Sequence, residues 1–231
     1  MIDTFLFKSH LISFEACMTN MFFVVEFIAM QSLTLIVLSY DRYVAICSPL
    51  RYTEIVTNKS ILVITVILWL IVGTANLFSA GFMSRLSYCK STVIHSYFCD
   101  HGPMPHLACN DNTPSVVMNW VLPVMVLWFP VLFITGTYMC IGRALLKIAA
   151  SERLKAMKTC TSHLLLVSVF YLPILITEAM GSAIDKNTKI INMSLSTLMP
   201  PLLNPFIYSL KTAEFKESIK KLYRRKIHIT V

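Results

Sequence analysis

The chain has 231 residues, of which 56% are hydrophobic and 14% are charged. Ordinary soluble domains carry about 25% charged residues, so this composition excludes such a domain and indicates a membrane protein. The formal net charge of +8 raises the question of nucleic-acid binding. The basic residues lie between apolar segments and not on one continuous face, which argues against a nucleic-acid partner.

Five apolar segments follow one another along the chain, and each reaches the roughly 20 residues that cross a membrane as a helix. They span residues 18–43, 61–82, 115–142, 161–183 and 188–210. The last segment is interrupted by prolines, which membrane helices tolerate when neighbouring groups bond the freed carbonyls. The predicted fold class is therefore an all-α membrane protein with five transmembrane helices.

Beyond the last segment, Phe215, Ile219 and Leu222 recur at helical spacing among many basic residues. This pattern predicts an amphipathic helix over about 212–225 that lies on the anionic inner leaflet, so membrane lipids are expected partners. The alternative is a disordered basic tail.

The distribution of basic residues predicts the orientation in the membrane. Fifteen Lys and Arg residues fall in one alternating set of loops and five fall in the other. Because cytoplasmic loops are enriched in Lys and Arg, the N-terminus is expected outside the cell and the C-terminus inside, in the cell membrane. Four cysteines then lie on the oxidising outer side, where three disulfide pairings are possible. They are Cys17, Cys89, Cys99 and Cys109.

Asp41, Arg42 and Tyr43 stand at the inner end of the first segment. Charge next to hydrocarbon is costly, so such a pair indicates a function. The surrounding run from Leu38 to Tyr52 resembles the signature of odorant receptors among the rhodopsin-like G-protein-coupled receptors. Three later runs resemble the same family in the same order, at residues 155–163, 170–173 and 201–211.

The resemblance implies one rhodopsin-like receptor domain over residues 1–231, which detects small odorants and signals through a heterotrimeric G protein of the olfactory stimulatory type. Counted from the C-terminus, the five segments match the last five of seven helices, so the first two are expected to be absent and the chain N-terminally truncated. The resemblance also implies the disulfides Cys17–Cys99 and Cys89–Cys109.

By the same resemblance, Arg42 is held by Asp41 at rest and is released toward the G protein on activation. The alternatives are a basic anchor that only sets topology, and for the late prolines a packing kink without a signalling role. The expected coupling and switch residues are Asp41, Arg42, Tyr43, Lys155, Lys158, Asn204, Pro205 and Tyr208.

Odorants are small and mostly apolar, so their site should be apolar with few polar groups. Glu26 and Glu178 are ionisable within apolar surroundings, which makes each a candidate for contact with a polar or cationic ligand. The candidate ligand-binding residues on the outer halves of the segments are Met21, Phe22, Val25, Glu26, Tyr171, Thr177 and Glu178.

Other classes of function are weighed against this prediction. The sequence has no phosphate-binding glycine loop, zinc-protease motif or nucleophile elbow, so no enzymatic activity, catalytic residue or cofactor is expected. His and Cys residues of the outer loop match no compact zinc site, and no metal is expected. A transporter or channel would have internal repeats, and none is found. The main alternative is a non-signalling receptor fragment or pseudogene product.

Overall fold

The computed structural model describes residues 12–89, 94, 99, 101–180 and 183–211. Within these ranges every regular element is a helix, and Tyr88 and Ala108 form one isolated β-bridge. The prediction of an all-α protein is therefore confirmed. The chain divides into two compact units, residues 1–157 and 158–231, which are described one at a time. The predicted tail helix at 212–225 lies outside the described residues.

Helix α2 (Phe14–Cys47) is the longest element, with 34 residues. It covers about 51 Å and therefore exceeds the roughly 30 Å of a hydrocarbon core. Ser13 caps its start by accepting a hydrogen bond from the Ala16 N–H at 3.3 Å. Its end comes just before Pro49, because a residue that precedes proline disfavours helical backbone. The cap at Ser13 and the stop before Pro49 explain why α2 is longer than the predicted span of 18–43.

A short connection of η1 (Pro49–Arg51) and α3 (Tyr52–Ile55) leads to α4 (Asn58–Ser84). The start of α4 is a capping box. Thr57 Oγ1 accepts from the Ser60 N–H at 3.1 Å, and Ser60 Oγ accepts from the Thr57 N–H at 3.0 Å. The cap begins the helix three residues before the apolar segment that the sequence predicts.

The third apolar segment does not form the single regular helix that the sequence predicts. It consists of α5 (Thr113–Pro123), a π-helical turn η3 (Val124–Trp128) and α6 (Phe129–Leu145). Together they form a continuous membrane-spanning stretch of 33 residues. Proline lacks a backbone N–H, and Pro123 and Pro130 border the turn, so the regular hydrogen-bond ladder cannot pass through it.

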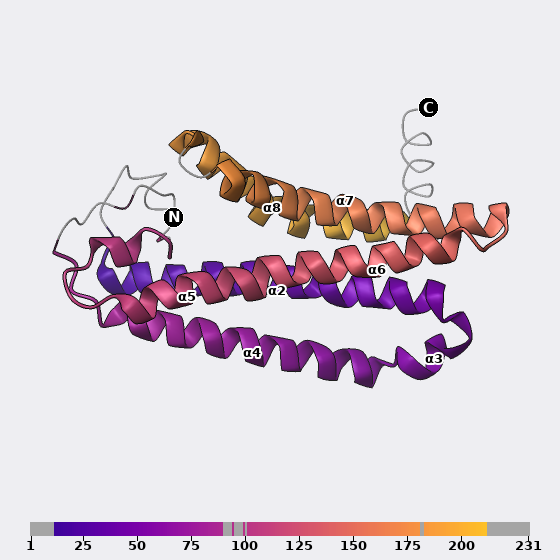
Figure 1. Cartoon of the computed structure of the whole chain (residues 1–231), viewed down its shortest axis with the longest axis horizontal. Helices are drawn as coiled ribbons and strands as arrows, with labels where there is room; N and C mark the ends of the chain where they lie inside the picture. The colour runs from indigo at the N-terminus through magenta and orange to yellow at the C-terminus, as the bar shows by residue number, and fades with distance from the viewer. Residues whose placement is uncertain (1–11, 90–93, 95–98, 100, 181–182, 212–231) are drawn as a thin grey trace, which may run out of the picture. The chain divides into compact units, whose positions relative to one another are not determined.

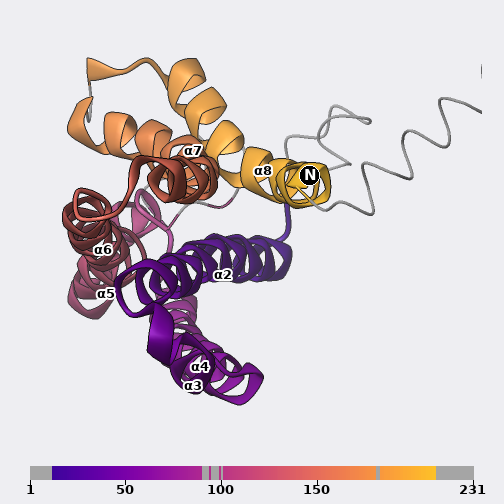
Figure 2. The same ribbon diagram turned by 90° about the vertical axis from the view of Figure 1, so that its right-hand side faces the viewer.

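In the first unit, α2 lies between α4 on one side and α6 on the other (Figures 1 and 2). Small and branched side chains form the middle of this packing, namely Ala29, Leu33, Ile36, Val72 and Val126. Nearer the end that carries Arg42, the Ser39 and Thr137 hydroxyls lie 2.5 Å apart and join α2 to α6. Interhelical bonds of this kind hold membrane helices together where lipid removes the hydrophobic driving force.

The second unit contains most of α7 (Ala150–Met180), which begins in the first unit, and all of α8 (Lys186–Lys211). Pro173 lies inside α7 without ending it. The N–H and hydroxyl of Thr188 both donate to the Asp185 carboxylate at the start of α8. Asn192 Nδ2 in α8 donates to Thr177 Oγ1 in α7 at 3.3 Å.

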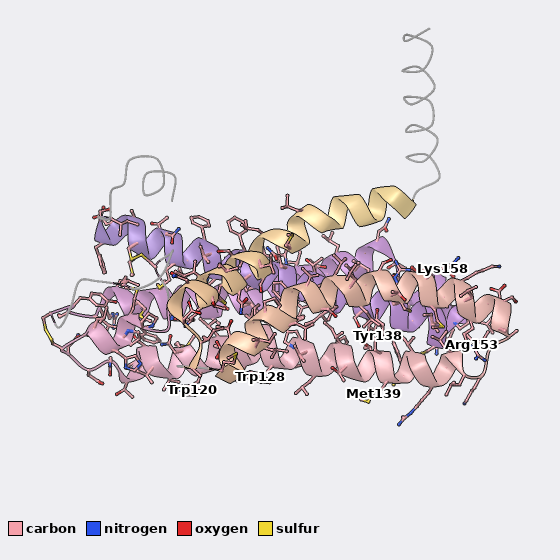
Figure 3. The ribbon with its side chains drawn as sticks, turned by 90° about the horizontal axis from the view of Figure 1, so that it is seen from above. Trp120, Trp128, Tyr138, Met139, Arg153 and Lys158 are labelled. Carbon is pink, nitrogen blue, oxygen red and sulfur yellow. A yellow bond between two sulfur atoms is a disulfide. The ribbon has the colours of Figure 1, made fainter. Side chains whose placement is uncertain are left out.

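Four helical stretches in the described ranges are long and apolar enough to cross a membrane, namely α2, α4, the α5–α6 stretch and α7. Helix α8 occupies the place of the fifth predicted segment. The outward faces of the first unit are apolar. Trp120 and Trp128, which point away from the α5–α6 stretch in Figure 3, are 74% and 47% exposed. Such faces suit contact with lipid.

Candidate functional site

At the Arg42 end of α2, the carboxylate of Asp41 has two partners. Its Oδ2 lies 3.6 Å from Arg42 Nε, and its Oδ1 accepts a hydrogen bond from Tyr52 Oη at 2.8 Å. Tyr52 comes from α3, eleven residues along the chain, so the loop after α2 folds back onto the acid. The side chains of Arg42 and Asp41 are 32% and 20% exposed, which leaves Arg42 accessible at this surface.

The electrostatics of the pair follow from these contacts. The hydrogen bond to Asp41 raises the pKa of the Tyr52 phenol, burial and the charge of Asp41 raise it further, and Arg42 opposes the shift. Tyr52 therefore stays protonated and donates at every physiological pH. A partly exposed ion pair is individually weak, so a modest conformational energy is sufficient to open it.

Basic side chains at the start of α7 are exposed at the connection from α6. Lys155 Nζ lies 2.9 Å from Glu152 Oε1, and Lys158 is also exposed. Figure 3 labels Lys158 and Arg153 near this connection. Tyr43, the third residue of the motif, is half-buried on α2.

At the opposite end, two disulfides hold the loop that follows α4. Cys17 is bonded to Cys99 with Cα atoms 5.4 Å apart, and Cys89 is bonded to Cys109 with Cα atoms 6.0 Å apart. These are the pairs that the resemblance implied. The first disulfide packs in a cluster with Met21 and Met83.

Four of the candidate ligand residues lie on α2 in the first unit. Met21 is buried against the disulfide cluster, while Phe22, Val25 and Glu26 are half-buried. Glu26 faces α4, where Asn76 Nδ2 donates both to Glu26 Oε2 at 3.1 Å and to the Phe22 carbonyl at 3.0 Å.

Space for the Glu26 carboxylate comes from a glycine on α4. A Cβ atom at Gly73 would lie 3.5 Å from Glu26 Oε1. The carboxylate thus rests on bare backbone beside one amide donor, in the half of α2 nearer the disulfides.

Comparison with known proteins decides the family. A family model described as olfactory receptor matches residues 1–226. Human olfactory receptor 6B3 is 36% identical over 226 residues, which are 96% of this chain and 68% of that receptor. Rat olfactory receptor 1500 is 36% identical over 210 residues, which are 90% of this chain and 67% of that receptor.

The chain belongs to the olfactory receptor family. Olfactory receptors are G-protein-coupled receptors and not enzymes, so the chain is a multi-pass membrane protein of the odorant-receptor class.

The remaining candidate residues of this olfactory receptor lie in the second unit. Tyr171 and Thr177 are buried on α7, and Thr177 Oγ1 donates to the Pro173 carbonyl at 2.8 Å. Glu178 is exposed. Asn204, Pro205 and Tyr208 fall within α8, and their side chains lie outside the described part of the structure.

Several polar residues outside the predicted site are brought together by the structure. Asn76 could have been noticed as a polar residue in an apolar span, and Tyr52 as part of the odorant-receptor signature. A third set of polar residues, Ser79, His101 and Asn119, joins α4, the outer loop and α5. His101 Nδ1 donates to Asn119 Oδ1 at 2.6 Å, and Ser79 Oγ lies 2.5 Å from His101 Nε2 in a second hydrogen bond.

The orientation of the Asn119 amide makes His101 Nδ1 the donor of this bond, because Asn119 Nδ2 donates to the Gly102 carbonyl at 3.3 Å. The oxygen of the amide is therefore the atom that faces His101. Among the residues that the structure describes, no three His, Cys, Asp or Glu side chains are grouped to hold a metal ion. The ring of His101 is thus engaged in helix-to-loop contacts.

Proposed function

We propose that this chain binds small odorants from the extracellular side and, through its Arg42 end, engages a heterotrimeric G protein of the olfactory stimulatory type. The excess of Lys and Arg on the loops at that end supports a cytoplasmic location for it and for the C-terminus. The N-terminus is then extracellular.

The observation that supports coupling best is the shared carboxylate of Asp41. Arg42 Nε is 3.6 Å from it, and the Tyr52 hydroxyl is 2.8 Å from its other oxygen. The Tyr52 hydroxyl draws on the negative charge of the same carboxylate, which weakens the attraction of Asp41 for Arg42. Arg42 is consequently held loosely and can be released toward a partner, with the exposed Lys155 and Lys158 as further contacts.

The ligand is proposed to contact Phe22, Val25 and Glu26 on α2, with Met21 beneath them. On α7, Tyr171, Thr177 and Glu178 remain candidates. Ligands shift a receptor only by differential affinity for its two states, so the bound odorant must favour the state in which Arg42 is free. Asn204, Pro205 and Tyr208 on α8 are proposed to take part in the same transition.

The test is a cAMP assay in cells that express the chain and are exposed to odorant mixtures, with surface labelling of each variant. We expect an odorant-dependent rise in cAMP, which Arg42→Ala abolishes. Asp41→Asn should raise basal cAMP because it frees Arg42. Glu54→Gln is the matched control, because Glu54 is paired with Arg51 at 3.7 Å in an exposed ion pair.

A chain that is verified at the cell surface and gives no response to any mixture would reject autonomous signalling. Equal basal cAMP in the Asp41→Asn and Glu54→Gln chains would reject only the proposal that Asp41 holds Arg42 at rest.

A further inference from the structure

The carbonyl of Val126, in the π-helical turn, lacks its usual backbone donor. In an α-helix this oxygen would accept from the N–H of residue 130, but Pro130 has none, and the proline ring also pushes against the carbonyl four residues before it. The neighbouring backbone bond runs from the Phe129 N–H to the Val124 carbonyl, which is the spacing of a π-helix. In the membrane interior no water replaces the missing donor.

A side chain of another helix supplies that donor. Ser32 Oγ in α2 donates to the Val126 carbonyl at 2.6 Å, across 94 residues of sequence. Ser32 is fully buried, and Ala29 and Leu33 beside it pack in the same cluster as Val126. A serine is short enough to let α2 and the turn approach closely and still presents a hydroxyl.

The π-helical turn has a consequence for α5. One extra residue in a helix turns the part before it by about 100° relative to the part after it. This rotation sets the face of α5 that meets the outer loop, where Asn119 Oδ1 lies 2.6 Å from His101 Nδ1. A regular helix through residues 124–128 would turn Asn119 away from the histidine.

We propose that Ser32 is a positioning residue that supplies the donor Pro130 lacks, stabilises the π-helical turn and thereby sets the rotation of α5 against the outer loop. Pro130 and Ser32 act as a pair, one removing a hydrogen bond of the helix and the other replacing it from α2. The inference goes beyond the proposed function and does not depend on it, because its tests measure stability and not signalling.

The first experiment is a thermal-unfolding cycle on the purified full chain in detergent. Ser32→Ala should lower the apparent Tm by about 2–4 °C, as expected for loss of one buried hydrogen bond in a chain of this size. Pro130→Ala restores a backbone N–H for the Val126 carbonyl. In the Pro130→Ala chain, Ser32→Ala should therefore lower the Tm by less than half as much as in the parent chain. Ser32→Thr keeps the hydroxyl and should retain most of the Tm.

The matched control is Thr34→Ala on the same helix, because Thr34 is exposed and its hydroxyl donates to the Met30 carbonyl of its own helix at 2.7 Å. It should leave the Tm nearly unchanged in both backgrounds. If Ser32→Ala prevents purification, Ser32→Cys provides a milder loss, because a thiol is a weak donor. An equal cost of the Ser32 variant with and without Pro130 would overturn the proposal.

The second experiment tests the rotation of α5, which would not change if Ser32 only stabilised the chain. In the parent chain, His101→Ala and Asn119→Ala should be non-additive in Tm, because the two side chains are bonded. In the Ser32→Ala/Pro130→Ala chain the same two changes should become additive. Persistence of the coupling there would show that α5 keeps its rotation without Ser32 and would overturn that part of the proposal.

Discussion

Replacement of Asn76 by alanine should destabilise the packing of α4 on α2. Asn76 is 1% exposed, and its amide donates to the Phe22 carbonyl at 3.0 Å and to Glu26 Oε2 at 3.1 Å. Loss of a buried donor costs about 1–3 kcal/mol, and interhelical bonds in membranes lie at the lower end of that range. For two bonds, one of them to a carboxylate, we expect about 2 kcal/mol, which corresponds to a fall in Tm of roughly 4–8 °C.

The assay is thermal unfolding of the purified chain, with Thr74→Ala as the control on the same helix. Thr74 is exposed and its hydroxyl donates to the Leu70 carbonyl of its own helix at 2.7 Å, so its loss should have little effect. Glu26→Gln should reduce the cost of Asn76→Ala, because the oxygen left without a donor is then uncharged. A Tm for Asn76→Ala equal to that of Thr74→Ala would refute this reasoning.

Three further predictions concern the two ends of the first unit. Tyr52→Phe should strengthen the attraction of Asp41 for Arg42 and raise the EC50 for an odorant about fivefold, the equivalent of one net hydrogen bond, in the cAMP assay. An unchanged EC50 would contradict the weakening of this ion pair by Tyr52. Cys99→Ser should reduce surface labelling and make the Tm less sensitive to mild reductant than in the parent chain, which has both disulfides. Equal sensitivity of the two chains would contradict a stabilising role of the Cys17–Cys99 bond. The Thr113 hydroxyl, followed by its N–H, lowers the pKa of Asp111 from 3.8, so these bonds stabilise the fold above pH 3.8 and are lost as the pH falls through the lowered value. Thr113→Val keeps the N–H and should reduce this part of the acid dependence of Tm, and identical profiles would contradict it.

Much of the helical organisation could be predicted from the sequence, because spans of about 20 apolar residues are a local property. The helix ends could not, since Ser13 and Thr57 cap helices from outside the apolar segments. The π-helical turn was also missed. Two prolines seven residues apart predict a disturbance of the ladder, but the form it takes depends on a hydroxyl 94 residues away.

The candidate site could likewise be predicted only in part. The pair of Asp41 and Arg42 is adjacent in sequence and could be recognised there. The second partner of Asp41 is Tyr52, which reaches it only because the loop after α2 folds back. The bond between Asn76 and Glu26 joins positions 50 residues apart on two helices, and no local pattern indicates which residues of α2 and α4 face each other.

The bond between Cys17 and Cys99 closes a covalent ring across 82 positions of sequence, which contains α2 from Cys17 onward and all of α3 and α4. A single proteolytic cut in the exposed turn near Arg51 would open this ring without releasing either long helix. The two fragments would migrate as one molecule until reductant separated them. The association of α2 with α4 is therefore covalently protected at the disulfide end, whatever happens to the connection at the Arg42 end.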